Sequence, residues 1–329
     1  LVNGYGWTGS SAILDYLSDF KNISLVPNEF DDLRVPYGFV DKVIMKIHNL
    51  EGKKSKSFSA LADFEPNNKI VSTRYKENFF IFKMLLRAFH VPIPFTKMWN
   101  KPFSYRTHFF FLFLKYLKEY RVTKKYLEKI DASRSVDDLK LLPSLWLDNI
   151  ASIYANKNNL VCFDQPLLID NVIDYIDLLE NSYLVVVIRN PKKQFADILS
   201  REVKFFHDYP WKVRYLFGFG KNDIQDIINI FVKSTEKRLN EIIKLKQKIK
   251  KNLILVDFDD FLKDPEIIIN KVSTLTGLSF EKLNRSTKKT KFDLNKSRLR
   301  NESLEINNQD ILNLVSKLNS KYMELKNYI

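Results

Sequence analysis

The sequence predicts an α/β protein with a doubly wound parallel sheet of about five strands and a large helical insertion. Three observations lead to this fold class. Short apolar, β-branched segments alternate along the chain with segments of helical periodicity, which is the pattern of parallel βα units. A glycine-rich turn directly follows the first apolar segment, and the aromatic region 41–159 shows mainly helical spacing.

Five short apolar segments are predicted to be strands. Pro27 is expected to close the second of them. The continuous β-branched run Tyr183–Ile188 is typical of a strand that is buried on both faces of a parallel sheet. The predicted strands are Leu1–Tyr5, Ile23–Val26, Leu160–Phe163, Tyr183–Ile188 and Leu253–Val256.

Helices are predicted between these strands and at the end of the chain, over Ser10–Phe20, Asn222–Lys250, Asp264–Leu275 and Gln309–Asn327. Residues 1–40 and 160–329 then form a nucleotide-binding α/β core, and 41–159 form a helical insertion punctuated by prolines that include Pro143. The insertion holds the apolar run Phe109–Leu114, which is too short to span a bilayer. Two interpretations of this run stay open, a core helix and an interfacial helix that touches a membrane.

Composition limits the classes of protein that the chain can belong to. Lys and Arg outnumber Asp and Glu by 53 to 39, giving a net charge of +14, which favours anionic partners or simply keeps the protein in solution. The single cysteine, Cys162, excludes an intrachain disulfide and is expected to be a buried strand residue. We expect a cytoplasmic protein, with contact to a membrane face as an open alternative. Four dispersed histidines and one cysteine have no metal-ligand spacing, so no metal is expected.

The glycine-rich turn Gly4–Ser11 carries the first functional signal. It matches the spacing of the P-loop pattern G-x-x-x-x-G-K-[ST], with Ser10 in place of the lysine. Backbone N–H groups of such a turn and the N-terminus of the following helix bind phosphate, and the hydroxyls of Ser10 and Ser11 are expected to donate to the same oxygens. The missing lysine indicates an anhydride without a γ-phosphate. A simple tight turn is the alternative.

Four segments, in this order along the chain, together resemble the sulfotransferases that use 3′-phosphoadenosine 5′-phosphosulfate (PAPS). Gly6–Ser11 resembles their 5′-phosphosulfate loop, and Val187–Pro191 resembles their strand followed by R-[ND]-P, whose arginine holds the 3′-phosphate. Leu253–Leu278 is similar to their strand, acidic turn, D-P-E and G-L stretch. Phe292–Asn301 is similar to the late loop that folds over the nucleotide.

The resemblance implies a set of residues that bind the donor. Trp7 stands where the family commonly has a lysine or arginine, and Asp197 stands where it has a serine, so either Asp197 points away or Ser200 replaces it. The implied cofactor-binding residues are Gly6, Trp7, Thr8, Gly9, Ser10, Ser11, Arg189, Asp197, Ser200, Ser297, Arg298 and Arg300.

Catalytic candidates follow the second predicted strand. Glu29 is similar in place to the acidic base of the glycan-modifying branch, and Asp31 and Asp32 are its rivals for deprotonating the acceptor hydroxyl. Arg34 is a candidate to replace the missing loop cation, with Lys42 and Lys46 as alternatives.

The predicted function is therefore transfer of a sulfuryl group from PAPS to a hydroxyl of a carbohydrate or glycan acceptor, which is acidic or lipid-linked in one version of the hypothesis. We expect no nucleic-acid partner, because the basic residues are scattered among acidic ones. Two alternatives stay open: an ATP-dependent P-loop kinase, and a catalytically inactive sulfotransferase-like binding protein.

Overall fold

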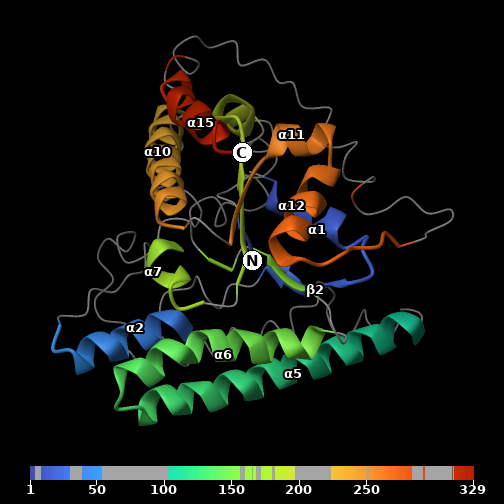
Figure 1. Cartoon of the computed structure of the whole chain (residues 1–329), viewed down its shortest axis with the longest axis vertical. Helices are drawn as coiled ribbons and strands as arrows, with labels where there is room; N and C mark the ends of the chain where they lie inside the picture. The colour runs from blue at the N-terminus through green and yellow to red at the C-terminus, as the bar shows by residue number, and fades with distance from the viewer. Residues whose placement is uncertain are drawn as a thin grey trace. The chain divides into compact units, whose positions relative to one another are not determined.

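The computed structural model of the chain (Figure 1) is an α/β protein, as predicted for its class. It describes residues 1–3, 9–29, 39–53, 103–155, 160–164, 166–167, 172–179, 182–196, 224–249, 252–283, 292, 313 and 315–329. The chain divides into two compact units. The first comprises Leu1–Phe30, Cys162–Asp174 and Ser182–Ile329, and the second comprises Asp31–Val161 and Tyr175–Asn181.

One sheet carries the described strands, in the order β2-β3-β1-β4-β5. Strand β1 pairs in parallel with β3 and β4, and β4 pairs in parallel with β5. Every residue of β4 is buried, in agreement with its continuous apolar sequence. The strands are β1 (Val2–Asn3), β2 (Ile23–Glu29), β3 (Leu160–Asp164), β4 (Leu184–Ile188) and β5 (Leu253–Asp257).

Strand β2 corrects the sequence prediction, because it continues through Pro27 to Glu29. Proline lacks the N–H that a central strand needs, but β2 lies at the edge of the sheet, where proline is tolerated. The expectation that Pro27 closes this strand is therefore wrong.

Helices of the first unit lie on two sides of the sheet. In Figure 1, α10 and α15 lie together on one side of β4 and β5, and α1 and α12 lie on the other. The sequence prediction missed α11, which begins directly after β5, and the helix expected from Gln309 is interrupted by a turn at 317–318. These helices are α1 (Ser10–Leu17), α10 (Ile224–Lys248), α11 (Phe258–Lys263), α12 (Glu266–Thr276) and α15 (Asn319–Lys326); the short α7 (Val172–Ile176) spans the division between the units.

The second unit contains α2 (Phe39–Leu50), α5 (Phe103–Ala132) and α6 (Val136–Tyr154), which pack against one another. The ring of Phe39 stacks on Trp146 at a centroid distance of 4.3 Å. The Trp146 Nε1–H donates to Thr123 Oγ1 at 3.0 Å, so the buried indole keeps a hydrogen-bond partner.

Helix α6 contains Pro143 in its interior, so this proline does not end the helix as the sequence analysis expected. Tertiary packing outweighs the local preference here, because Pro143 is buried among the core residues of α6. Among the described residues, no helix is both long and apolar enough to cross a membrane. The side chains of Phe109–Phe113, on which the interfacial interpretation depends, are not described.

Candidate functional site

Strands β3, β1 and β4 are neighbours in the sheet, and their carboxyl ends reach the same edge. Val2 of β1 pairs with Asp164 of β3 and with Val185 of β4, and both pairings are parallel. The strand that follows β1 in sequence, β2, lies on one side of β1 in the sheet. The strand that follows β4, β5, lies on the opposite side. In open α/β sheets, ligands bind at this kind of switch point, beyond the carboxyl ends of the strands. The candidate site is therefore the edge of the sheet at which β1 ends and Arg189 follows β4.

The start of α1 requires a glycine. Gly9 is the N-cap of α1, and its φ of 93° lies in the left-handed region. A Cβ at this position would lie 2.6 Å from the Cζ of Phe258, and two further ring carbons are closer still. The first turn of α1 contains no acidic residue, so the positive end of the helix dipole favours an anion there.

The two serines that open α1 differ in their surroundings. Ser10 is buried, whereas Ser11 is exposed and donates its hydroxyl proton to Asp164 Oδ2 at 3.3 Å. A serine hydroxyl has one proton and two lone pairs. While Ser11 donates to Asp164, its oxygen keeps lone pairs that can accept a hydrogen bond or bind a cation, and its role towards phosphate stays a prediction.

Arg189 follows the last residue of β4 and is only 6% exposed. Its guanidinium carbon lies 5.0 Å from the centroid of the Phe258 ring. The next two residues, Asn190 and Pro191, begin a short helix. The Asn190 Oδ1 accepts from the N–H groups of Lys192 at 3.0 Å and Lys193 at 3.4 Å, and Pro191 takes the first helical position of 191–196. Arg189 thus follows the end of β4, Asn190 caps the helical turn 191–196, and Pro191 is the first residue of that turn.

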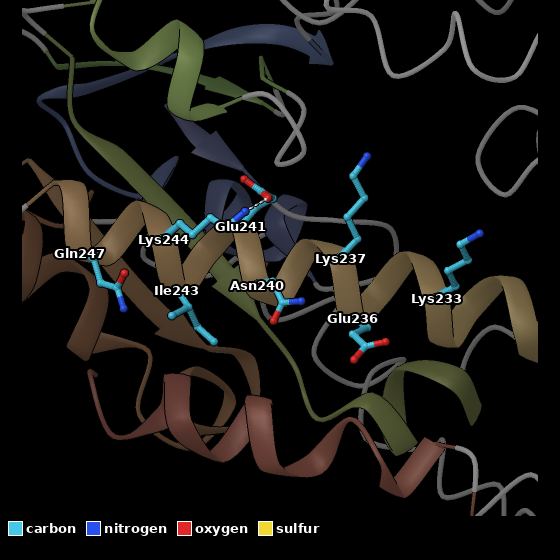
Figure 2. Close-up of a pocket in the computed structure, with 8 residues that line it drawn as sticks. All are labelled: Lys233, Glu236, Lys237, Asn240, Glu241, Ile243, Lys244 and Gln247. Atoms are coloured by element: carbon cyan, nitrogen blue, oxygen red, sulfur yellow. Dashed lines mark hydrogen bonds and ion pairs between the residues drawn. The ribbon is translucent and has the colours of Figure 1, made fainter.

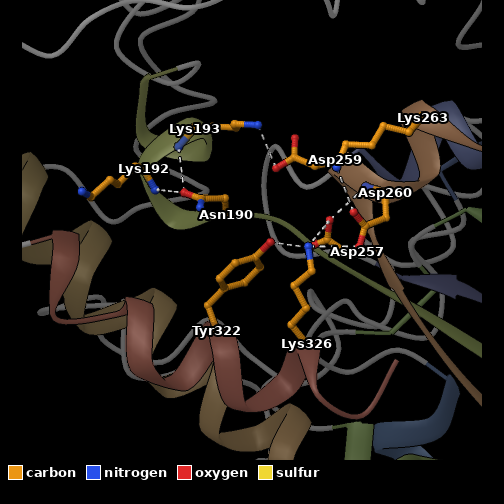
Figure 3. A network of polar contacts seen from close by, with 9 residues as sticks. All are labelled: Asn190, Lys192, Lys193, Asp257, Asp259, Asp260, Lys263, Tyr322 and Lys326. Carbon is orange, nitrogen blue, oxygen red and sulfur yellow. Dashed lines mark hydrogen bonds and ion pairs between the residues drawn. The ribbon is translucent and has the colours of Figure 1, made fainter.

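A polar network fixes the end of β5 beside these residues (Figure 3). The buried Asp257 caps α11 by accepting from the Asp260 N–H at 3.0 Å, and its other oxygen accepts from the Tyr322 hydroxyl. Burial, together with the hydrogen bond to Asp257, raises the pKa of Tyr322. Lys326 lies 3.0 Å from Asp260 and 3.8 Å from Asp257, and Lys193 lies 3.1 Å from Asp259. Strand β5, α15 and the helical turn after β4 are therefore joined by hydrogen bonds and ion pairs.

Phe292 is the first residue of the predicted late loop, Phe292–Asn301, and the one residue of that loop that the structure describes. It is 4% exposed, and its ring packs edge-on against Tyr16 of α1 and Phe261 of α11, at centroid distances of 5.4 and 5.3 Å. Phe292 is therefore held in the core beside α1.

A hollow of about 590 Å³ runs along α10 (Figure 2). All its lining residues belong to α10, and three of its charged residues have ion-pair partners: Lys244 pairs with Glu241 at 2.8 Å, and Glu236 pairs with Lys321 at 2.9 Å. No predicted site residue lines the hollow, so we do not place the candidate site there.

The structure places only part of the predicted site. Gly9, Ser10, Ser11 and Arg189 are described and belong to the same unit. Glu29 is the last residue of β2, but its side chain is not described. The predicted residues outside the described part of the chain are Gly6, Trp7, Thr8, Asp31, Arg34, Asp197, Ser200, Ser297, Arg298 and Arg300. The roles of all these residues stay predictions.

Sequence reasoning missed two residues of this edge, Asp164 and Phe258. Asp164 had a usable signal, because a carboxylate directly after an apolar strand lies at the carboxyl edge of a parallel sheet. Phe258 had none, since its contacts come from segments far away in the sequence. Among the described residues, no group of three or more His, Cys, Asp or Glu side chains is placed to hold a metal ion.

The sequence matches no known protein-family profile and no curated protein. Among solved structures, the chain is similar to the sulfotransferase domain of the olefin synthase from Synechococcus PCC 7002, with 11% sequence identity and a TM-score of 0.40. The match covers 96% of this chain and 92% of that domain. A similarity at this level does not assign an activity.

Proposed function

We propose that the protein is a PAPS-dependent sulfotransferase with the P-loop form of the doubly wound fold. The observation that carries the proposal is the pairing of β1 with β4, which brings the start of α1 and Arg189 to one edge of the sheet. A donor with phosphates on both sides of an adenosine fits two anion-binding elements at neighbouring strand ends.

In this proposal the start of α1 and Arg189 bind the two ends of the donor. The N–H groups at the start of α1 bind the 5′-phosphosulfate, with Gly9 admitting the close backbone approach. Arg189 binds the 3′-phosphate with a bidentate fork, which suits phosphate better than an ammonium group does. Arg298 and Arg300, which follow Phe292 in the sequence, add positive charge at the same phosphate.

The chemical step is an in-line displacement at sulfur. The bond between sulfur and the bridging oxygen of the donor breaks while the acceptor oxygen forms its bond to sulfur, leaving adenosine 3′,5′-bisphosphate. Glu29 accepts the proton of the acceptor hydroxyl, with Asp31 as its rival, and Arg34 stabilises the charge that develops on the bridging oxygen. The acceptor is a hydroxyl of a carbohydrate or glycan.

Calorimetric titration tests this function. We expect adenosine 3′,5′-bisphosphate to bind without magnesium, and Arg189→Ala to weaken it by about 1.5–3 kcal/mol, the range for hydrogen bonds to charged groups. Lys192→Ala is the matched control, because Lys192 is an exposed cation three residues further on and should leave binding unchanged. Equal binding by the parent and the Arg189 variant would refute the assignment.

A second candidate function is supported by the Ser11–Asp164 hydrogen bond. In P-loop phosphotransferases, a loop serine or threonine and a strand-end aspartate hold Mg²⁺ together with phosphate oxygens. A hydroxyl whose proton is engaged by a carboxylate presents the lone pairs that such a cation needs. Under this alternative the protein is an ATP-dependent kinase.

One substitution separates the two functions. Asp164→Asn keeps an acceptor for Ser11 and removes the negative charge. We expect it to leave the bisphosphate bound as well as before or more tightly if the protein uses PAPS. It should weaken magnesium-dependent ATP binding at least about tenfold, or 1.4 kcal/mol, if the protein is a kinase.

A further inference from the structure

We propose that Phe258 is a positioning residue, whose ring fixes the Arg189 guanidinium relative to the start of α1 and thereby sets the preference for ligands with a second phosphate. This inference deepens the proposed function and rests on it. No role for Phe258 follows from the sequence pattern.

The sheet brings Phe258 and Arg189 together. Ile188 pairs with Asp257 in the parallel register of β4 and β5, so the residues that follow them, Arg189 and Phe258, are neighbours across the sheet. Phe258 is fully buried, and its ring lies 5.0 Å from the guanidinium carbon. An arginine held at the face of a buried ring gains a cation–π interaction and loses freedom to reorient.

The same ring also contacts the start of α1. Gly9 approaches Phe258 so closely that a Cβ there would overlap the ring. The Gly9 backbone and the Arg189 guanidinium therefore both rest on one rigid side chain. Because a phenyl ring has a fixed width, it limits how closely these two groups approach each other.

Phe258 is itself held in place from two directions. Asp257, the preceding residue, caps α11 and accepts the hydrogen bond of Tyr322. Phe261, one helical turn further on, is fully buried against Tyr16 of α1. A ring fixed in this way transmits a defined position to Arg189, whereas an ordinary core phenylalanine only fills space.

Phe258→Leu tests the proposal, because leucine keeps an apolar side chain but lacks the flat face and the ring width. Calorimetry would give the dissociation constants for adenosine 3′,5′-bisphosphate and for adenosine 5′-monophosphate. We expect the preference for the bisphosphate to fall at least about tenfold, equivalent to 1.4 kcal/mol. If Phe258→Leu does not fold, Phe258→Met takes its place, since methionine fills irregular space.

Phe39→Leu is the matched control. Phe39 is also fully buried, but it stacks on Trp146 in the other unit. This variant should lose stability and keep the parent's preference for the bisphosphate. A Phe258→Leu protein that keeps the parent's preference, while Arg189→Ala loses it, would overturn the proposal.

A ligand-independent measurement separates this inference from the proposed function. If the parent does not bind the bisphosphate, the proposed function fails, and positioning is then judged from arginine reactivity. Arg189 is 6% exposed, so we expect phenylglyoxal to modify it slowly in the parent and in Phe39→Leu, and several-fold faster in Phe258→Leu. Equal modification rates, measured by mass spectrometry of the peptide that contains Arg189, would overturn the positioning role.

Discussion

Replacing Gly9 by alanine tests the geometry at the start of α1 without reference to any ligand. The substitution adds one methyl group, and the structure gives it two separate penalties. The backbone has a φ of 93°, which L side chains rarely adopt, and the new Cβ would overlap the Phe258 ring. Phe258 is fully buried, so the ring has no solvent to move into.

The magnitude follows from these two penalties. A left-handed conformation costs an alanine about 1–2 kcal/mol, and overpacking a buried site costs about 1–3 kcal/mol. The free energy of unfolding should therefore fall by about 2–5 kcal/mol, a large share of the 5–15 kcal/mol that stabilises a typical domain.

Gly277→Ala provides the matched control for the backbone penalty. Gly277 ends α12 with a φ of 69°, and a Cβ there would meet nothing within 4 Å. Urea denaturation of both variants should show a larger loss for Gly9→Ala, by about 1–3 kcal/mol, because only this site has the steric overlap. Adding Phe258→Leu to Gly9→Ala should recover part of this excess. Equal losses for the two glycine variants would show that Phe258 does not lie against Gly9.

Three further predictions concern buried polar groups. Tyr322→Phe leaves the buried Asp257 without one of its donors and should lower the free energy of unfolding by about 1–3 kcal/mol in urea. Thr123→Val removes the acceptor of the Trp146 indole N–H and should also lower the free energy of unfolding by about 1–3 kcal/mol in urea. Burial raises the pKa of Cys162 to about 11, and only the thiolate reacts, so at pH 8 about one thiol in a thousand is ionised. Iodoacetamide should therefore label Cys162 only after unfolding, and labelling of the native protein at the rate of a free thiol would contradict its burial.

Periodicity predicted the parts of the fold whose signals are local. Strand β4 is a continuous apolar run and was found within one residue of its observed bounds. The short α11 was missed, because its two buried phenylalanines lie among acidic residues that suggested a turn. The predictions that Pro27 and Pro143 interrupt regular structure were wrong because they used local rules alone. A strand at the edge of a sheet and a well-packed helix both tolerate a proline.

The candidate site shows the same division between local and distant information. Arg189 could be singled out because it follows a clear apolar strand and, with Asn190 and Pro191, resembles the R-[ND]-P element, all of which is local information. Phe258 could not, since its contacts with Gly9 and Arg189 exist only after β1, β4 and β5 have assembled. The sequence therefore identifies Arg189 at the end of a strand, whereas its contact with the Phe258 ring exists only in the folded protein.

The order of the strands implies an orientation for an anionic ligand at this edge. Strand β1 lies between β3, which ends at the carboxylate of Asp164, and β4, which is followed by the guanidinium of Arg189. Two strand spacings separate β3 from β4 by roughly 10 Å, and a unit charge at that distance contributes about 1.7 kcal/mol at an effective dielectric constant of 20. The more anionic end of a ligand is therefore drawn towards Arg189, and its other end lies on the side of Asp164. That side suits a bound cation, and it is where the kinase alternative places Mg²⁺.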